Sequence, residues 1–240
     1  MDEITNFETL KAVVEDMQSK KDQIGIDGVF ASTSLKPGED WRWQTHLADL
    51  PVYFEYQDNN VDDMAELSFT HNEEFKNIFD LYLNNSTIDP ALASSKAVTD
   101  SMAEFALGKA AMVQNGNWAY GQVAEVSGNT VKAEDVKMLP IYTGRKGEET
   151  QGLNIGTENY FSINSQASEV DQKATADFVN WLITSEKGKK FMVEKLGFIP
   201  PFSTFTEGDQ PTDPLAQEVI KSMSDTEKTS VPWEIGRAHV

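Results

Sequence analysis

The stretch MAEFALGKAAMVQNGNW, residues 102–118, decides the fold class of this chain. Its first half carries apolar residues at helical spacing and ends at Gly108, a residue that favours helix termination. The apolar run 110–113 then predicts a short strand, and Asn117 is placed to cap a new helix that begins at Trp118. A helix, a strand and a second helix in direct succession are typical of an α/β protein.

The same alternation of helices and short strands continues on both sides of this stretch. The spacing of apolar residues and the positions of Gly, Pro and capping residues predict the further elements. Helices are expected over residues 7–17, 41–50, 72–82, 171–184, 185–196 and 213–223, and strands over residues 29–31, 136–139 and 160–163. We expect Trp43 and Trp181, which lie on the apolar faces of two of these helices, to be core residues.

The composition excludes several classes of function. Acidic residues outnumber basic residues 39 to 20, and the formal net charge of the 240-residue chain is −19. Binding to nucleic acid or to anionic lipid needs a surface rich in Lys and Arg. The chain has no cysteine, which excludes disulfides, thiolate nucleophiles and cysteine-ligated metals. No apolar stretch approaches the roughly 18 residues needed to span a bilayer, and the acidic residues 1–20 do not resemble a signal peptide.

Signatures of catalysis and metal binding are missing from the sequence. The histidines His46, His71 and His239 have no spacing typical of metal ligands, and each is expected on a surface or a helix. No nucleophile elbow, phosphate-binding loop or dinucleotide fingerprint occurs. Adjacent acids such as Glu148 and Glu149 are expected on a solvated face, because a chain this acidic contains such pairs by chance. We therefore expect neither an enzyme nor a cofactor.

Aromatic and polar residues gather where predicted loops meet helices or strands. Sites in α/β proteins form at such junctions, where backbone amides and helix N-termini point into a crevice. A sugar offers an apolar C–H face on which an indole stacks, and hydroxyls that Asp, Asn and Glu side chains bind. The candidate ligand-binding residues are Asp40, Trp41, Asn115, Asn117, Trp118, Glu158 and Asn159.

Residues 102–118 resemble a segment of the bacterial extracellular solute-binding proteins of carbohydrate ABC transporters. In that family a helix with the pattern F..G.AAM precedes a strand and then an NG.W motif at the start of a helix. Residues 6–10, 178–188 and 195–200 are similar to further segments of the family. The resemblance extends in consistent order from about residue 5 to residue 234, which makes it more specific than any single motif.

The resemblance implies an α/β fold of the periplasmic-binding-protein-like II type, in which a hinge joins two lobes and the ligand lies between them. Residues 1–151 correspond to the first part of the C-terminal lobe, and residues 152–211 to the later part of the N-terminal lobe. Residues 212–234 return to the C-terminal lobe. The N-terminal lobe is thus expected to be incomplete and the chain to be a fragment, with a non-native tail at residues 235–240.

For function, the resemblance implies a protein that binds an extracellular sugar or oligosaccharide and delivers it to the permease subunits of an ABC-type importer. Trp118 is then the stacking platform, while Asp40 and Trp41 lie in a cleft loop. Glu158 and Asn159 lie where the chain crosses between the lobes. The implied location is the outer face of the cell membrane, as a lipoprotein, or the periplasm. The implied state is a monomer that uses no cofactor.

The residues themselves leave other functions open. Another solute, such as a polyamine or a peptide, is the nearest alternative, and a cation is compatible with Glu158, Asp40 and the paired indoles. Anions are disfavoured because no cluster of Lys or Arg lies at the candidate junctions. A carbohydrate-active enzyme would need two carboxylates flanking the scissile bond. An interaction module without a ligand would lack a large cleft.

Overall fold

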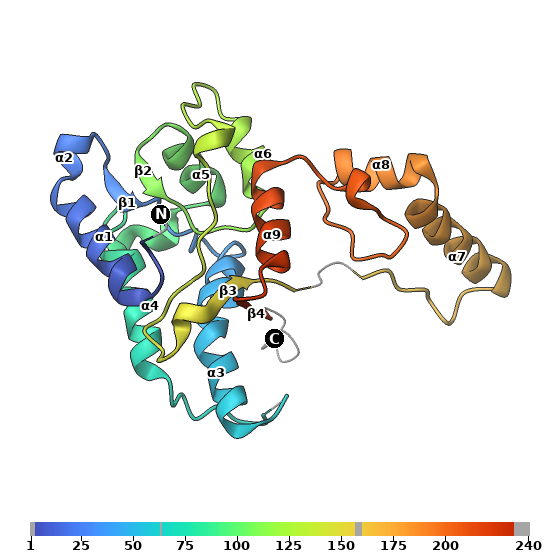
Figure 1. Cartoon of the computed structure of the whole chain (residues 1–240), viewed down its shortest axis with the longest axis horizontal. Coiled ribbons are helices and arrows are strands. Elements are labelled where there is room, and N and C mark those ends of the chain that lie inside the picture. Colours follow the sequence, from blue (N-terminus) through green and yellow to red (C-terminus); the bar gives the residue numbers. More distant parts are fainter. Residues whose placement is uncertain (1–2, 63, 157–159, 233–240) are drawn as a thin grey trace.

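The computed structural model describes residues 3–62, 64–156 and 160–232, and Figure 1 shows the course of the chain. Its α-helices are α1 (Phe7–Ser19), α2 (Lys21–Ile24), α3 (Asp49–Asn59), α4 (Asn72–Asn84), α5 (Val98–Ala106), α6 (Ala119–Ala124), α7 (Glu169–Thr184), α8 (Glu186–Glu194) and α9 (Pro214–Ser224). A π-helical turn, η1 (Trp43–Ala48), precedes α3. Short 3-10 turns are η2 (Pro90–Ser95), η3 (Ala133–Asp135), η4 (Glu148–Thr150) and η5 (Glu207–Asp209). The strands are β1 (Gly28–Phe30), β2 (Ala110–Met112), β3 (Gln151–Asn154) and β4 (Thr229–Val231).

The strands form two separate pairs, and both pairs are parallel. In the first pair, β1 lies beside β2 with Phe30 opposite Met112. In the second pair, β3 lies beside β4. The two strands of each pair are distant in sequence. The strands predicted around residues 29–31 and 110–113 are confirmed. Residues 136–139 and 160–163 belong to no strand in the described part of the chain, and these two predictions are wrong.

The largest core cluster joins α1, β1, η1 and α4. Helix α1 begins at an Asn6 cap, whose side chain accepts a hydrogen bond from the Thr9 amide, and it buries Leu10 and Val14. Trp43 is buried in the same cluster, as predicted. Ring stacking between Phe30 of β1 and Tyr82 of α4 is part of this core. Each large apolar side chain removed from water contributes on the order of 1.5–3 kcal/mol.

Glu148 is a buried carboxylate that connects two segments of the core. Its side chain is 6% exposed. It accepts a hydrogen bond from the Phe7 amide at the start of α1, and two more from the amides of Thr143 and Gly144 at 2.8 and 2.9 Å. The prediction that Glu148 and Glu149 share a solvated face is therefore correct for Glu149 and wrong for Glu148. Sequence spacing does not distinguish a carboxylate with three amide donors from an exposed one.

Glu55 in α3 is a second buried carboxylate, and it organises the loop that follows the helix. Its side chain is 2% exposed and accepts hydrogen bonds from the amides of Ser68 and Thr70. Phe69 between them adopts a positive φ of 52°. The hydrogen bond from the Ser68 amide is the main cause that lowers the pKa of Glu55 below the value of 4.5 for a free side chain.

We predict that Glu55→Gln will be less stable than the native chain at pH 7, and that this difference will shrink in acid. A carboxyl whose pKa is lower in the folded state stabilises the fold above its unfolded pKa, and this contribution is lost as the pH falls through the folded pKa. Urea unfolding at neutral pH and at pH values below 4.5 would measure it. Glu66→Gln, exposed in the same loop, is the control. A stability difference that stays constant with pH would contradict the assignment.

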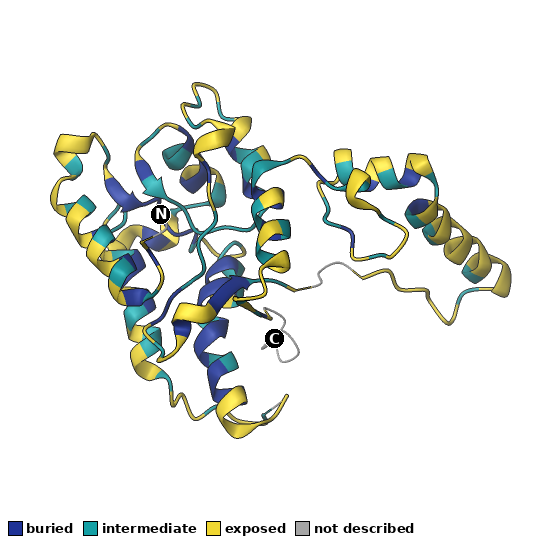
Figure 2. Cartoon of the chain, viewed as in Figure 1, coloured by how far each residue is buried: buried dark blue, intermediate teal, exposed yellow. Residues whose placement is uncertain are grey.

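Helices α7 and α8 form a separate unit that Figure 1 shows at a distance from α1–α5. The two helices pack against each other, and α8 also contacts η5. Lys189 of α8 donates a hydrogen bond to Asp209 at 2.6 Å, which lowers the pKa of Asp209 to about 2. Most of α7 is exposed in Figure 2, and Leu182 is its buried residue. Trp181 is 45% exposed and stacks on Phe178, so the prediction that it is a core residue is wrong.

None of the helices within the described ranges is long and apolar enough to cross a bilayer. The predicted non-native tail at residues 235–240 lies outside the described residues.

Candidate ligand-binding cavity

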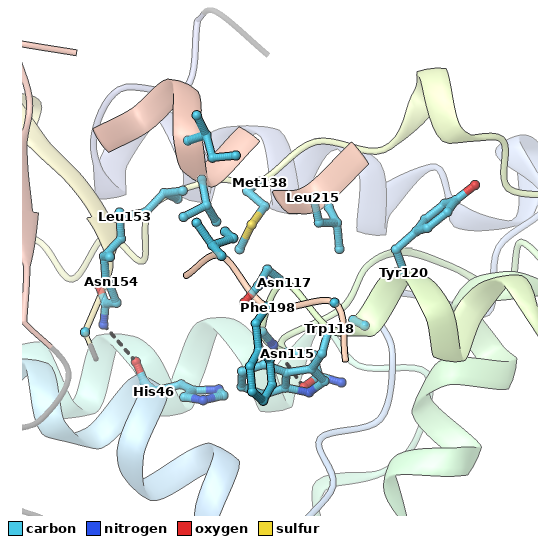
Figure 3. Close-up of a pocket in the computed structure, with 18 of the residues that line it drawn as sticks. His46, Asn115, Asn117, Trp118, Tyr120, Met138, Leu153, Asn154, Phe198 and Leu215 are labelled. Carbon is cyan, nitrogen blue, oxygen red and sulfur yellow. Dashed lines mark hydrogen bonds between the residues drawn. The ribbon is translucent and has the colours of Figure 1, made fainter. Parts of the chain in front are cut away.

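A cavity of about 1600 Å³ lies beyond the carboxyl ends of β2 and β3. The chain leaving β2 supplies Gln114 and Trp118 to its wall, and the last residue of β3 supplies the side chain of Asn154. Leu215 of α9 and Phe198 from the loop after α8 also line the cavity (Figure 3). Crevices at the carboxyl ends of parallel strands are the usual place for ligands in α/β proteins.

Three aromatic rings form a contiguous group at one end of the cavity. The ring centroid of Trp41 lies 6.1 Å from Trp118 and 5.4 Å from His46, and the centroids of His46 and Trp118 are 5.8 Å apart. Trp118 and His46 line the cavity, and Trp41 contacts both rings without being part of the wall. Rings this close leave no room for a ligand between them, so a ligand would contact the outer surface of the group.

His46 is the member of this group that sequence reasoning missed. It lies in the helical turn η1, one of the two places expected for it, and it is 5% exposed. Its Nδ1 lies 2.6 Å from the side-chain nitrogen of Gln114, and its backbone carbonyl accepts a hydrogen bond from Asn154. The π-helical turn η1 explains the miss, because residues five apart, such as Trp41 and His46, share a face only where the helix is widened. Such turns occur frequently at functional sites.

Both the oxygen and the nitrogen of the Asn115 side-chain amide are hydrogen-bonded to other groups of the chain. Its Oδ1 accepts hydrogen bonds from the Arg42 guanidinium at 3.3 Å and from the Gly116 amide at 2.9 Å. Its Nδ2 donates to Gln122 at 3.2 Å. The guanidinium of Arg42 also lies 4.2 Å from the centre of the Trp41 ring. Burial lowers the pKa of Arg42, and the charge of Glu39 partly offsets that effect.

The sequence model of one protein family, described as bacterial extracellular solute-binding protein, matches residues 2–218. The chain belongs to this family. The match confirms the resemblance at the level of bacterial extracellular solute-binding proteins. Searches of curated proteins and of solved structures gave no match. Membership means that the function of this solute-binding protein is to bind a ligand outside the cytoplasm for import.

The other predicted site residues of the solute-binding protein have different positions. Asn117 lines the cavity beside Trp118, but it does not cap α6, which begins at Ala119 without a side-chain cap. Asp40 is not part of the cavity wall, and its carboxylate accepts a hydrogen bond from the side-chain Nε2 of Gln44 at 2.9 Å. Glu158 and Asn159 lie outside the described residues.

Few charged side chains line the cavity of the solute-binding protein. Among the described residues, its charged lining groups are Asp135, Lys137 and Glu207. The same part of the chain has no group of three or more His, Cys, Asp or Glu side chains that could hold a metal ion. Amide, imidazole and indole groups from Gln114, Asn117, His46 and Trp118 line the cavity together with apolar side chains. This lining is suited to a neutral ligand with hydrogen-bonding groups.

The indole of Trp118 packs directly against Gly116. We predict that Gly116→Ala will displace this indole. A Cβ atom at position 116 would lie 2.3 Å from two ring carbons of Trp118. Overpacking of this kind costs about 1–3 kcal/mol. We expect the displaced indole to weaken ligand binding and to change the near-ultraviolet circular dichroism spectrum. Gly121→Ala is the control, because a Cβ there meets nothing within 4 Å. Equal ligand affinity in Gly116→Ala and Gly121→Ala would show that contact with Gly116 does not determine the position of the Trp118 indole.

Proposed function

We propose that this solute-binding protein binds a neutral sugar or oligosaccharide in the cavity and delivers it to the permease of an ABC-type importer. The observation that carries the proposal is the indole of Trp118 at the cavity wall beside side-chain amides. The indole would stack on the C–H face of a sugar ring. Asn117 and Asn154 offer amides that both donate and accept, as sugar hydroxyls require.

The sparse charge of the lining supports a neutral ligand over the alternatives. An anion would need a convergent cluster of Lys or Arg, and Lys137 is the basic residue among the described lining groups. A polyamine would need convergent carboxylates near the indoles, but the Asp40 carboxylate is engaged by Gln44 away from the wall. Asn117 and Trp118 therefore favour a polyol over either class of ion.

We also propose that residues 152–211 belong to a second lobe that moves against the rest of the chain. The separation of α7 and α8 from α1–α5 supports this division, as does the exposure of Phe178 and Trp181. In this arrangement residues 1–151 and 212–234 form the other lobe, and Glu158 and Asn159 lie at the crossing. Ligand binding would then favour a closed form that the permease recognises.

A thermal-shift screen followed by isothermal titration would test the proposed function. The panel contains neutral oligosaccharides, spermidine, a short peptide and phosphate. We expect a neutral sugar to raise the melting temperature, since a ligand at 100 times its Kd stabilises by about 2.7 kcal/mol. We expect no product in a parallel assay for glycoside hydrolysis. A shift given by spermidine or peptide alone, or turnover of a sugar, would refute the proposal in favour of that alternative.

A further inference from the structure

Arg42 lies behind the cavity wall rather than in it. Its side chain is 9% exposed and is absent from the residues that line the cavity. Nevertheless it contacts both indole-bearing segments of the candidate site. Its guanidinium covers the Trp41 ring and donates through Nε to Oδ1 of Asn115, at the start of the turn that leads to Trp118.

The amide of Asn115 has no capacity left for a ligand. An Asn side chain offers two hydrogens and two acceptor lone pairs. Its oxygen already accepts from Arg42 and from the backbone of Gly116, and its nitrogen donates to Gln122 and contacts the sulfur of Met102 at 3.6 Å. Asn115 lines the cavity, but all four of these positions are occupied by groups of this chain.

We propose that Arg42 and Asn115 are positioning residues that set the orientation of Trp118 relative to Trp41 and do not touch the ligand. Arg42 anchors Asn115, Asn115 fixes the Gly116 amide, and Gly116 packs under the Trp118 ring. Side chains in a binding constellation hold their geometry when a supporting layer of hydrogen bonds fixes their orientation. The inference rests on the proposed function only for its statement about the ligand.

Asn115→Asp and Asn115→Leu distinguish positioning from ligand contact. Aspartate keeps both acceptor interactions and adds a charge pair with Arg42, but it removes the Nδ2 donor. We expect Asn115→Asp to bind maltotriose, a neutral trisaccharide probe, within about threefold of the native Kd, and Asn115→Leu to bind it about tenfold or more weakly. An equal loss in both variants would show that Asn115 donates to the ligand, and would overturn the proposal.

Arg42→Met tests the anchor without any ligand. We expect it to change the near-ultraviolet circular dichroism and the acrylamide quenching assigned to Trp118 by comparison with Trp118→Phe. Arg145→Met is the matched control, because Arg145 also covers an aromatic ring, Phe54, and donates to an amide oxygen, that of Gln57. An unchanged Trp118 signal in Arg42→Met would overturn the proposal.

The double variant Arg42→Met/Asn115→Leu shows whether the two residues act as one unit. If they do, the second substitution adds little to the effect of the first on the Trp118 signal. Additive effects would mean that they act independently, against the proposal. Failure of the native chain to bind any sugar would refute the proposed function, while the ligand-free Trp118 signal would still decide the positioning role.

Discussion

Trp118→Ala should weaken sugar binding by about 2–3 kcal/mol, which is roughly a thirty- to hundred-fold increase in Kd. The loss has two parts, namely the apolar area that the sugar face no longer buries and the stacking on the indole. Because Trp118 is partly exposed at the cavity wall rather than central to the core, the melting temperature without ligand should change little. Isothermal titration gives the affinity, and a thermal melt gives the stability.

Trp181→Ala is the matched control for this prediction. Trp181 is also a partly exposed tryptophan, but it stacks on Phe178 of the same helix and is not part of the cavity wall. Its removal should leave the Kd within about threefold of the native value, because an exposed side chain outside the site changes little. Two results would refute the role of Trp118: an unchanged affinity in Trp118→Ala, or a collapse of its fold without ligand.

Glu148→Ala should lower the free energy of unfolding by about 3–5 kcal/mol. The substitution leaves the buried amides of Phe7 and Thr143 and the more exposed amide of Gly144 without their acceptor, and each unsatisfied buried donor costs on the order of 1–3 kcal/mol. The total is a large fraction of the roughly 5–15 kcal/mol that stabilises a typical domain. Urea unfolding followed by far-ultraviolet circular dichroism would measure it.

The neighbouring Glu149 provides the control for Glu148. Its side chain is exposed, so Glu149→Ala should change stability by no more than about 0.5 kcal/mol. The pair differs by one position in sequence and has the same side chain, so any difference comes from the environment alone. A loss below about 1 kcal/mol in Glu148→Ala would mean that water replaces the carboxylate as acceptor.

Helices and strands that depend on the spacing of nearby residues were predicted well from the sequence. The second half of helix α5 and all of strand β2 lie within the stretch 102–118 and were expected from its periodicity and from Gly108. Helix α9 begins at the expected Asp213 cap, whose side chain accepts from two backbone amides. Strands β3 and β4 were not expected, because Gln151–Asn154 and Thr229–Val231 are short and become strands only by pairing across the long segment between them.

The candidate site was predicted in part from the sequence. Asn117 and Trp118 line the cavity as expected, because residues that follow a parallel strand reach its carboxyl edge. Asp40 was expected to line a cleft, yet it lies outside the wall, in the turn before η1, and the side chain of Gln44 in η1 donates to its carboxylate. His46 was missed because its place depends on the widened turn η1, for which the sequence has no periodic signal.

By itself, the sequence determined the family of this protein, its alternating helices and strands, and the place of Trp118 shortly after a strand, where it lines the cavity. These properties depend on residues close together in the chain, where spacing and capping act directly. The tertiary structure alone decided that Arg42 supports Asn115, that His46 joins Trp41 and Trp118, and that Glu148 is buried. Each of these depends on segments distant in sequence, whose approach is determined by packing rather than by local pattern.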